Sequence, residues 1–480
     1  MIRTGGKQFL GWLCIACILS SAGCGHSQQQ QQMQSQPPDE IAQSSDEEVS
    51  DLSVEKQTVT VAVLGSLNTL DQVVVEFNKQ NTCYEAVIVE YDFFEGPQKL
   101  ETELATGKAP DLLDVQLLYP DKLVEKKLLA DLSPYLEDGK GIERQDLVEA
   151  VLRSNTIDGV LTCIPEAFAL EVLVGKPQLL GNTPGWTIAE YTNCIQENRG
   201  LEVMGSNRFS NSNNPSGHAV VELPLHGDIA HWADYRQGKA LFDQEDFRVL
   251  LELAGDYEVT QPAVDLWDVE ELQEGRMLTY VTALYGMKDY LLLNAALQQE
   301  IVYKGYPTED GTPTYSLLGR NGYAINAASQ VQDGAWALIE FLMTYSPPNN
   351  SMDEIPAEWF STLEVRFDDQ MSQAMIREYQ RDQNYEVIYD EKGEPVEVSK
   401  YEERSEDGSV TVESLAARPG DVDNLRRLID AASQPSDITT DSLYQIAYEE
   451  IYVYLSDRRS VEETIDIIQN RVQLYLDENK

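Results

Sequence analysis

Apolar residues near the start of the chain recur at two spacings, which predict strands and helices in turn. Residues 59–64 form a run of Val, Ala, Leu and Thr that is typical of a buried strand. Apolar side chains then recur at helical spacing, at Leu70, Val73, Val74 and Phe77. A second β-rich run spans 86–91, a second helix is expected at 98–106, and a third strand at 112–115. This β-α-β-α-β order predicts a parallel sheet with right-handed crossovers.

Residues that follow the first two predicted strands are candidates for ligand contact. In an open α/β sheet, ligands bind outside the carboxyl ends of the strands. Ser66 follows the first strand in a Gly-Ser turn, and Phe93 and Phe94 follow the second strand. The sequence therefore places these three side chains beside the expected binding cleft.

Later segments predict further elements. Capping boxes begin two helical patterns, with Ser and Gln at positions 329 and 332 and with Ser and Glu at 460 and 463. The second of these patterns is the final helix of the chain. Residues 386–389 and 396–398 predict a short hairpin, and residues 205–227, rich in Asn, Ser and Gly, predict a long loop. Such loops often line a binding site.

Three of the four histidines lie in or near this predicted loop, at His218, His226 and His231. A metal site needs three or four converging ligands. The spacing of these histidines fits no compact metal motif. We therefore expect loop or surface histidines, and no bound metal.

Length and charge narrow the classes of protein and partner. With 480 residues the chain is too long for one core of usual size, so two lobes are expected. It has 35 basic and 82 acidic residues, a formal net charge of −47. Nucleic acid and anionic lipid surfaces repel such a chain, so neither is an expected partner. Solubility is the expected main role of the charge.

The beginning of the chain has the pattern of an exported protein. Arg3 and Lys7 precede an apolar run at 9–20, which predicts a secretory signal peptide and is too short to span a membrane. The Ser-Ala-Gly-Cys sequence that ends at Cys24 is similar to a lipobox, in which the cysteine is lipidated. The alternative is cleavage that leaves a free thiol. Residues 24–57 are polar and predict a disordered linker.

Neither the remaining cysteines nor any known catalytic motif indicates a catalytic centre in this chain. Cys83, Cys163 and Cys194 are odd in number and lack metal-ligand spacing, which predicts mostly buried thiols. Whether two of them form a disulfide stays open at this point. The chain has no Gly-x-Ser-x-Gly elbow, phosphate loop or His-Glu-x-x-His motif. We expect a protein that is not an enzyme and has no cofactor.

Short phrases along the chain carry a family resemblance. Residues 106–111 read Thr-Gly-Lys-Ala-Pro-Asp, and residues 158–165 read Asp-Gly-Val-Leu-Thr-Cys-Ile-Pro. Residues 231–247 and 468–476 add a Phe-Asp-Gln-Glu-Asp-Phe helix start and a closing Ile-Gln-Asn-Arg-Val phrase. In this order the phrases resemble bacterial extracellular solute-binding proteins of family 1, the binding components of ABC-type carbohydrate importers. The last two resemble Gram-positive gut members of that family.

The resemblance implies an α/β fold of the two-lobed, periplasmic-binding-protein-like type II class. Each lobe is expected to have a mixed or parallel sheet flanked by helices, with a helical extension at the C-terminus. After a signal peptide at 1–23 and the linker, lobe 1 is expected at 58–160, with 317–345 returning to it. Lobe 2 is expected at 161–316, and residues 346–480 are expected to be an acidic insertion and helices that pack on the lobes.

The resemblance also implies a function and further contact residues. A monomer, lipid-anchored on the extracellular face of the membrane, would capture a small solute, most simply a carbohydrate, and deliver it to ABC permease subunits. Position beside the expected cleft adds Glu166, Trp232, Tyr285 and Tyr323 as candidate ligand contacts. Trp232 could stack on a sugar or pack between the lobes. A surface lipoprotein for adhesion or sensing, and a secreted glycan-active enzyme, are the alternative functions.

Overall fold

A computed structural model gives the fold of most of the chain. It describes residues 55–64, 70–115, 118, 120–206, 217–234, 237–259, 272–345, 359–404, 411–432, 442–457 and 459–478. These belong to one compact unit, Val54–Lys480. Ser66, Cys24, the signal peptide and most of the linker lie outside the described residues. Within the described ranges, no helix has the length and apolar character needed to cross a bilayer.

The elements follow one another in a mixed α/β order. The strands are β1 (Gln57–Leu64), β2 (Tyr84–Tyr91), β3 (Leu112–Asp114), β4 (Thr156–Ile157), β5 (Val160–Leu161), β6 (Ile164–Gly175), β7 (Glu202–Ser206), β8 (Ala233–Asp234), β9 (Lys239–Ala240), β10 (Met277–Leu284), β11 (Val302–Tyr303), β12 (Ser316–Ile325), β13 (Phe360–Ser361), β14 (Tyr401–Arg404) and β15 (Thr411–Ser414). The helices are α1 (Leu70–Gln80), α2 (Gly96–Ala105), α3 (Pro120–Glu125), α4 (Glu149–Ser154), α5 (Pro177–Leu180), α6 (Ile188–Glu197), α7 (His218–Gly227), α8 (Ile229–Trp232), α9 (Glu245–Gly255), α11 (Met287–Ala296), α12 (Gln332–Thr344), α13 (Glu364–Ala374), α14 (Pro419–Ala431), α15 (Ser442–Asp457) and α16 (Val461–Glu478), with 3-10 turns at Ser133–Leu136 and Arg144–Asp146.

The β-α-β-α-β unit predicted at the start of the folded part is present. β1 pairs in parallel with β2 along its whole length and with β3 on its other edge. α1 buries Leu70, Val74 and Phe77, which belong to the predicted apolar face. α2 ends before Gly107, whose φ of +68° is the left-handed conformation favoured just after a helix. The prediction for this stretch is confirmed.

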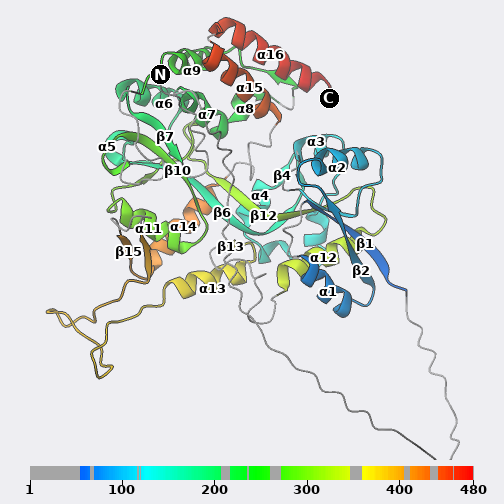
Figure 1. Ribbon diagram of the computed structural model, residues 1–480, viewed down its shortest axis with the longest axis horizontal. Coiled ribbons are helices and arrows are strands. Elements are labelled where there is room, and N and C mark those ends of the chain that lie inside the picture. The colour runs from blue at the N-terminus through cyan, green and yellow to red at the C-terminus, as the bar shows by residue number, and fades with distance from the viewer. Residues whose placement is uncertain are drawn as a thin grey trace, which may run out of the picture. The chain divides into compact units, whose positions relative to one another are not determined.

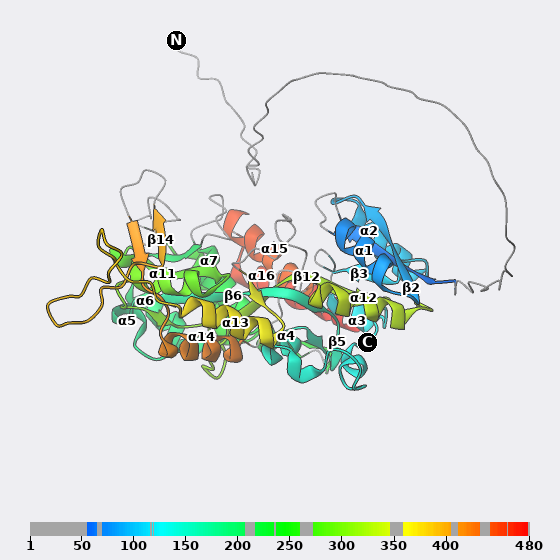
Figure 2. The same ribbon diagram turned by 90° about the horizontal axis from the view of Figure 1, so that it is seen from below.

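Two long antiparallel strands, β6 and β12, lie in the middle of the main sheet. This nine-stranded sheet has the continuous order β2-β1-β3-β12-β6-β10-β7, with β11 and β13 pairing on β6. Both views show β6 and β12 running between the group of β1–β3 with α1–α3 and the group of α5–α7 (Figures 1 and 2). The apolar core is divided in the same way, into two clusters on the β1–β3 side and two on the β10–β7 side. The expected α/β class and its division into two parts are confirmed.

The C-terminal helices pack on the β10–β7 side and also contact the β1–β3 side. α15 and α16 contribute Tyr444 and Ile468 to the core cluster that contains α7 and α9. The side-chain amide of Gln473 in α16 accepts from the backbone N–H of Ala240 and donates to the carbonyl of Gly238, at 3.0 and 2.9 Å. Tyr475 Oη donates to Glu125 Oε2 of α3 at 3.4 Å. The predicted final helix therefore joins segments far apart in the sequence.

Residues 218–227 form a helix, α7, where the sequence predicted a loop. His218 and His226 are both buried on it, so the expectation of loop or surface histidines is wrong for these two. His218 Nδ1 lies 2.8 Å from Glu222 Oε2, and His226 Nε2 lies 3.1 Å from Tyr444 Oη. Buried polar groups need such partners. Tyr444 lies on another helix, 218 residues later, which is why the sequence did not reveal the pairing.

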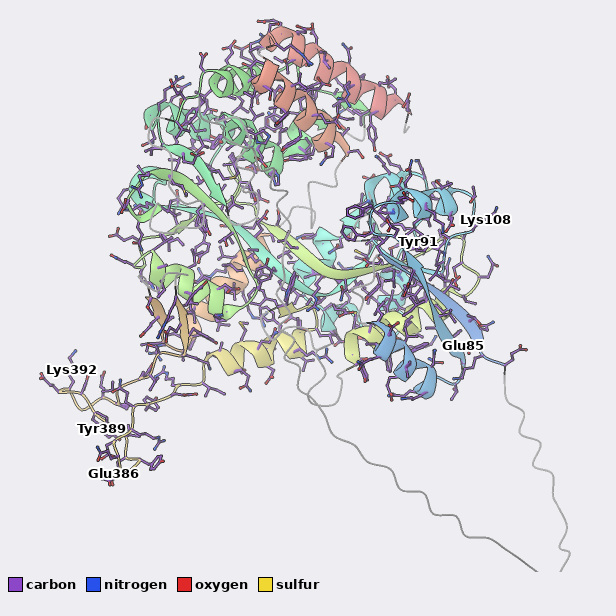
Figure 3. All side chains as sticks on the ribbon, viewed as in Figure 1. Glu85, Tyr91, Lys108, Glu386, Tyr389 and Lys392 are labelled. Atoms are coloured by element: carbon purple, nitrogen blue, oxygen red, sulfur yellow. The ribbon has the colours of Figure 1, made fainter. Side chains whose placement is uncertain are left out.

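The predicted hairpin near residue 390 is part of a larger arm, residues 376–400. Three backbone hydrogen bonds join Gln380, Ile388 and Val396 in a ring, from each N–H to the carbonyl of another member. Two turns leave this junction, and in each an aspartate carboxylate accepts two backbone N–H groups, at Asp382 and Asp390. Figure 3 shows Glu386, Tyr389 and Lys392 at the outer end of the arm, away from the body of the fold. The three-way junction replaces the simple hairpin that was expected.

The question of the disulfide is resolved by the structure. Cys83 is exposed, Cys163 is buried and Cys194 is partly buried, and all three are free thiols. Burial raises the pKa of the Cys163 thiol to about 12, so this thiol stays protonated and unreactive at neutral pH.

The packing of α7 against α9 generates a first prediction. A Cβ at Gly217, just before α7, would lie 1.9 Å from the backbone oxygen of Ala254 in α9. Gly217→Ala should therefore lower the free energy of unfolding by about 1–3 kcal/mol, because two backbones must move apart.

Gly420 in α14 has no atom within 4 Å of its Cβ position. Gly420→Ala should raise stability by up to about 1 kcal/mol through helix propensity.

Urea unfolding of both variants beside the unmodified protein measures these differences. An unchanged midpoint for Gly217→Ala would contradict the close approach of α7 and α9.

Candidate functional site

The two central strands are covered along most of their length and open at one place. Within β6, Glu166 is the residue that is not fully buried. Within β12, residues 318–321 are partly exposed, while both ends of the strand are buried. Arg320 lies in this stretch and pairs in register with Ala167, next to Glu166. Polar side chains can therefore reach solvent where β6 and β12 pair.

The backbone of β12 bends at this place. Asn321 has a φ of +53°, in the left-handed region that Asn tolerates better than most residues. The register runs from Arg320↔Ala167 to Gly322↔Pro165. The strand therefore bends at the point where Arg320 faces β6, between two segments that hold regular pairing.

An aromatic pair lies beside the same part of β6. Tyr285 directly follows β10 and Trp359 directly precedes β13, and their ring centroids are 4.9 Å apart in an edge-to-face arrangement. β10 pairs with β6 as far as Leu170, and β13 pairs with the preceding residues, Ala167 and Phe168. Because the two strands meet β6 at neighbouring positions, the two rings come together.

Arg320 joins this pair to the charged part of the site. The central carbon of its guanidinium lies 5.9 Å from the centroid of the Trp359 ring, which is within the range of a cation–π contact. The site thus contains a cation, two aromatic rings and a carboxyl group, contributed by four segments of the chain.

The Glu166 carboxyl has an unusual protonation state. Burial raises its pKa from the ordinary 4.5 to about 7, and the charge of Arg320, hydrogen bonding from Asn321 and Tyr323, and the charge of Arg366 oppose this rise. Burial also keeps the Tyr323 hydroxyl protonated, with its pKa well above 10. At neutral pH Glu166 is therefore present in both its charged and its neutral form, and it can accept or donate a hydrogen bond.

Arg366, on α13, hydrogen-bonds the end of another helix near the site. Its Nη1 donates to the carbonyl of Met343 at 2.9 Å and its Nη2 donates to that of Thr344 at 2.7 Å. These are the last carbonyls of α12, which have no partner within the helix. Arg366 therefore fixes α13 to the end of α12, and its positive charge also acts on the Glu166 carboxyl.

The structure brings three of the predicted contact residues together. Glu166, Tyr285 and Tyr323 all lie at the candidate site on β6 and β12, although Tyr323 is buried and its hydroxyl is hydrogen-bonded to Glu166. Phe93 and Phe94 are exposed by 51% and 78%, at the end of β2, and their rings contact each other 5.4 Å apart. They stay exposed candidates without a described contact to the Glu166 site.

Trp232 occupies a core position. Its side chain has no exposed surface, and its ring lies 5.7 Å from the ring of Phe247 in the core cluster of α7, α9 and α16. The sequence left two interpretations, stacking on a sugar and packing between the lobes. The structure shows packing, within a single core cluster. A sugar could not reach the ring without opening this core.

The sequence did not single out Arg320 or Trp359. The signal for Arg320 was a charged residue in the Gly-Arg-Asn-Gly sequence of an otherwise apolar strand, since glycines in a strand often mark a bend or close approach. Trp359 came from an irregular acidic stretch and had no local signal. As for metals, no group of three or more His, Cys, Asp or Glu side chains among the described residues could hold an ion.

The sequence of the chain matches the profile of a known protein family. The profile of the bacterial extracellular solute-binding proteins matches residues 72–352, more than half of the chain. The chain belongs to this family. The resemblance to extracellular solute-binding proteins that the sequence indicated is confirmed at this level. The matched residues include both β6 and β12. Comparison with curated proteins finds no match.

Solved structures of other proteins resemble the chain at low identity. The sugar-binding protein MalE of Xanthomonas citri is 15% identical, with a TM-score of 0.49, and the alignment covers 88% of this chain and 98% of that one. Maltose-bound MalE3 of T. maritima is 17% identical, with a TM-score of 0.44 and coverages of 87% and 99%. At TM-scores below 0.5 these likenesses add nothing to the family assignment, which rests on the sequence match.

The raised pKa of Glu166 predicts a pH-dependent contribution to stability. Between pH 4.5 and about 7 the folded solute-binding protein keeps the Glu166 proton that the unfolded chain releases. Stability from this group is therefore present at low pH and is lost as pH rises through this window. Glu166→Gln removes the effect, so the stability of the variant relative to the unmodified protein should rise by up to about 3 kcal/mol from pH 4.5 to 7.5.

Chemical unfolding across this pH range measures the difference. Glu394→Gln, on the exposed arm, is the control and should show no such trend. A pH-independent difference for Glu166→Gln would show that the carboxyl ionises normally.

Proposed function

We propose that the protein is a membrane-anchored extracellular solute-binding protein that captures a small carbohydrate and delivers it to an ABC permease. The observation that carries the proposal is the group of Tyr285, Trp359, Arg320 and Glu166 at the pairing of β6 and β12, in a chain of the solute-binding family. Flat aromatic faces pack against the C–H surfaces of sugar rings, and charged groups hydrogen-bond hydroxyls.

The proposed mechanism is closure of two lobes around the ligand. We keep the boundaries expected from the sequence, with lobe 1 at 58–160 and 317–345, lobe 2 at 161–316, and the C-terminal extension at 346–480. β6 and β12 would connect the lobes, so a bend in these strands changes the angle between them. A ligand that contacts both lobes shifts the equilibrium toward the closed form, and that form docks on the permease.

The proposed location follows from the N-terminal sequence. Export by the signal at 1–23 and lipidation of Cys24 would hold the protein at the outer face of the membrane, with 24–57 as its tether. The protein would act as a monomer, without a cofactor, and its task would be binding and not catalysis. Family membership supports the extracellular location; the lipid anchor and the permease partner are inferences from the sequence.

A thermal-shift screen tests the ligand class. A panel of mono- and oligosaccharides, with peptides and polyamines as controls, would be added to the purified protein. Ligand at about 100 times its Kd should add roughly 2.7 kcal/mol of stability. A sugar that stabilises the protein and is not turned over supports the proposal. A response to a control class alone would contradict carbohydrate as the ligand, and no response at all would favour the adhesion or sensing function.

Substitution of Trp359 tests the place of binding. Trp359→Ala should weaken the affinity for the stabilising sugar about tenfold or more, because about 1.4 kcal/mol of ring contact is lost. Tyr389→Ala is the control, since this tyrosine is 61% exposed on the arm. Titration calorimetry gives both affinities, and ligand-free unfolding shows whether either variant has lost stability. Equal affinities for Trp359→Ala and the unmodified protein would place the ligand elsewhere.

A further inference from the structure

Arg320 differs from the other partly buried arginines because its guanidinium has no hydrogen-bond acceptor or ion-pair partner in the described part of the chain. Arg366 donates to the carbonyls at the end of α12, and Arg153 donates to those of Asp430 and Ala432. Arg471 pairs with the carboxylates of Glu449 and Glu450. The Nη1 of Arg320 is fully covered and has no acceptor among the described residues. Arg418 also has a covered Nη1 without an acceptor, but its Nη2 pairs with Glu397 at 2.7 Å.

The surroundings of Arg320 compensate for its charge only in part. Loss of solvent lowers the pKa of Arg320, although a guanidinium stays charged in any protein. The Trp359 ring offers a cation–π contact but no hydrogen-bond acceptor. Glu166 attracts the cation, yet it makes no ion pair with it and carries only part of a negative charge at neutral pH. A buried donor without an acceptor destabilises the fold, and it does so more strongly when the group is charged.

The unsatisfied cation lies beside the aromatic pair of the proposed ligand site. We propose that Arg320 binds a singly charged oxyanion of the ligand, so that the preferred substrates are acidic sugars. This inference rests on the proposed function and narrows its substrate class. The planar guanidinium matches a carboxylate or a sulfate ester with two parallel hydrogen bonds. In a chain with a net charge of −47, a local cation offsets the repulsion that an anionic ligand meets.

Glu166 gives this recognition a dependence on pH. The groups that face its carboxyl are Arg320, Asn321 and Tyr323 of β12 and Arg366 of α13. A ligand anion at Arg320 would repel the charged form of Glu166, so binding favours the neutral form and takes up a proton. Affinity for the acidic sugar should therefore fall as pH rises from about 6 to 8.

Matched sugars distinguish an acidic from a neutral preference. The probes are digalacturonate and galactobiose, which differ in the group at C6, glucuronate-terminated and glucose-terminated xylo-oligosaccharides, and a sulfated galactose disaccharide. Calorimetry with the purified full chain at low salt gives the affinities. We expect one acidic member to bind at least tenfold more tightly than its neutral partner. A preference for the uronic or for the sulfated member identifies which oxyanion is read.

Arg320→Gln tests the residue itself. This variant should lose the tenfold preference and its pH dependence, because the acidic and the neutral sugar then meet the same uncharged side chain. Arg144→Gln is the matched control, because this exposed arginine is already paired with Glu149 at 2.6 Å and lies on another element. The control should keep the preference. If Arg320→Gln fails to fold, the preference of the unmodified protein and its weakening by added salt decide the question.

Three outcomes would overturn the inference. Equal or tighter binding of the neutral partner overturns the acidic preference and leaves the carbohydrate proposal in place. A preference that survives in Arg320→Gln removes Arg320 from the recognition. Failure of every acidic and neutral sugar to bind overturns the carbohydrate proposal, and the acidic-sugar inference with it.

Discussion

The antiparallel pairing of β6 with β12 is the constraint on which the rest of the structure depends. It runs from Ser316↔Glu171 to Tyr323↔Ile164 and connects the β1–β3 part of the sheet, through β3 and β12, with β10 and β7. The four core clusters are arranged on its two sides. The same pairing brings Glu166 and Arg320 together. One set of backbone hydrogen bonds thus supports both the architecture and the candidate site.

The electrostatics of the site contrast with those of the whole chain. The protein has a large excess of acidic residues, yet the site contains Arg320, has Arg366 nearby, and includes one carboxyl whose burial raises its pKa to about 7. An excess of negative charge of this kind favours solubility and repels other anions. The site reverses this charge locally, and a ligand that reaches it meets a cation, two rings and a group that can donate or accept a proton.

The C-terminal helices give the second part of the fold much of its core. Gln473 of α16 hydrogen-bonds the backbone around β9, and α15 covers His226 through Tyr444. Trp232 lies in the same cluster and is fully buried. These contacts explain why a tryptophan suitable for stacking on a sugar, and histidines in a polar stretch, became core residues. The partner of His226, Tyr444, lies 218 residues away in the sequence, and Gln473 lies 233 residues from Ala240, to which it is hydrogen-bonded.

The sequence by itself determined the elements whose signal is local. The periods of apolar residues defined β1, α1, β2, α2 and α16, and the order of strands and helices gave the α/β class, because spacing along one element decides which face is buried. The tertiary structure alone decided which side chains form the site. Arg320, Trp359 and Tyr285 come from three different segments and meet only because β12, β13 and β10 all pair with β6. Strand pairing between distant segments has no local signature, so no pattern in the chain could place Trp359 over Arg320.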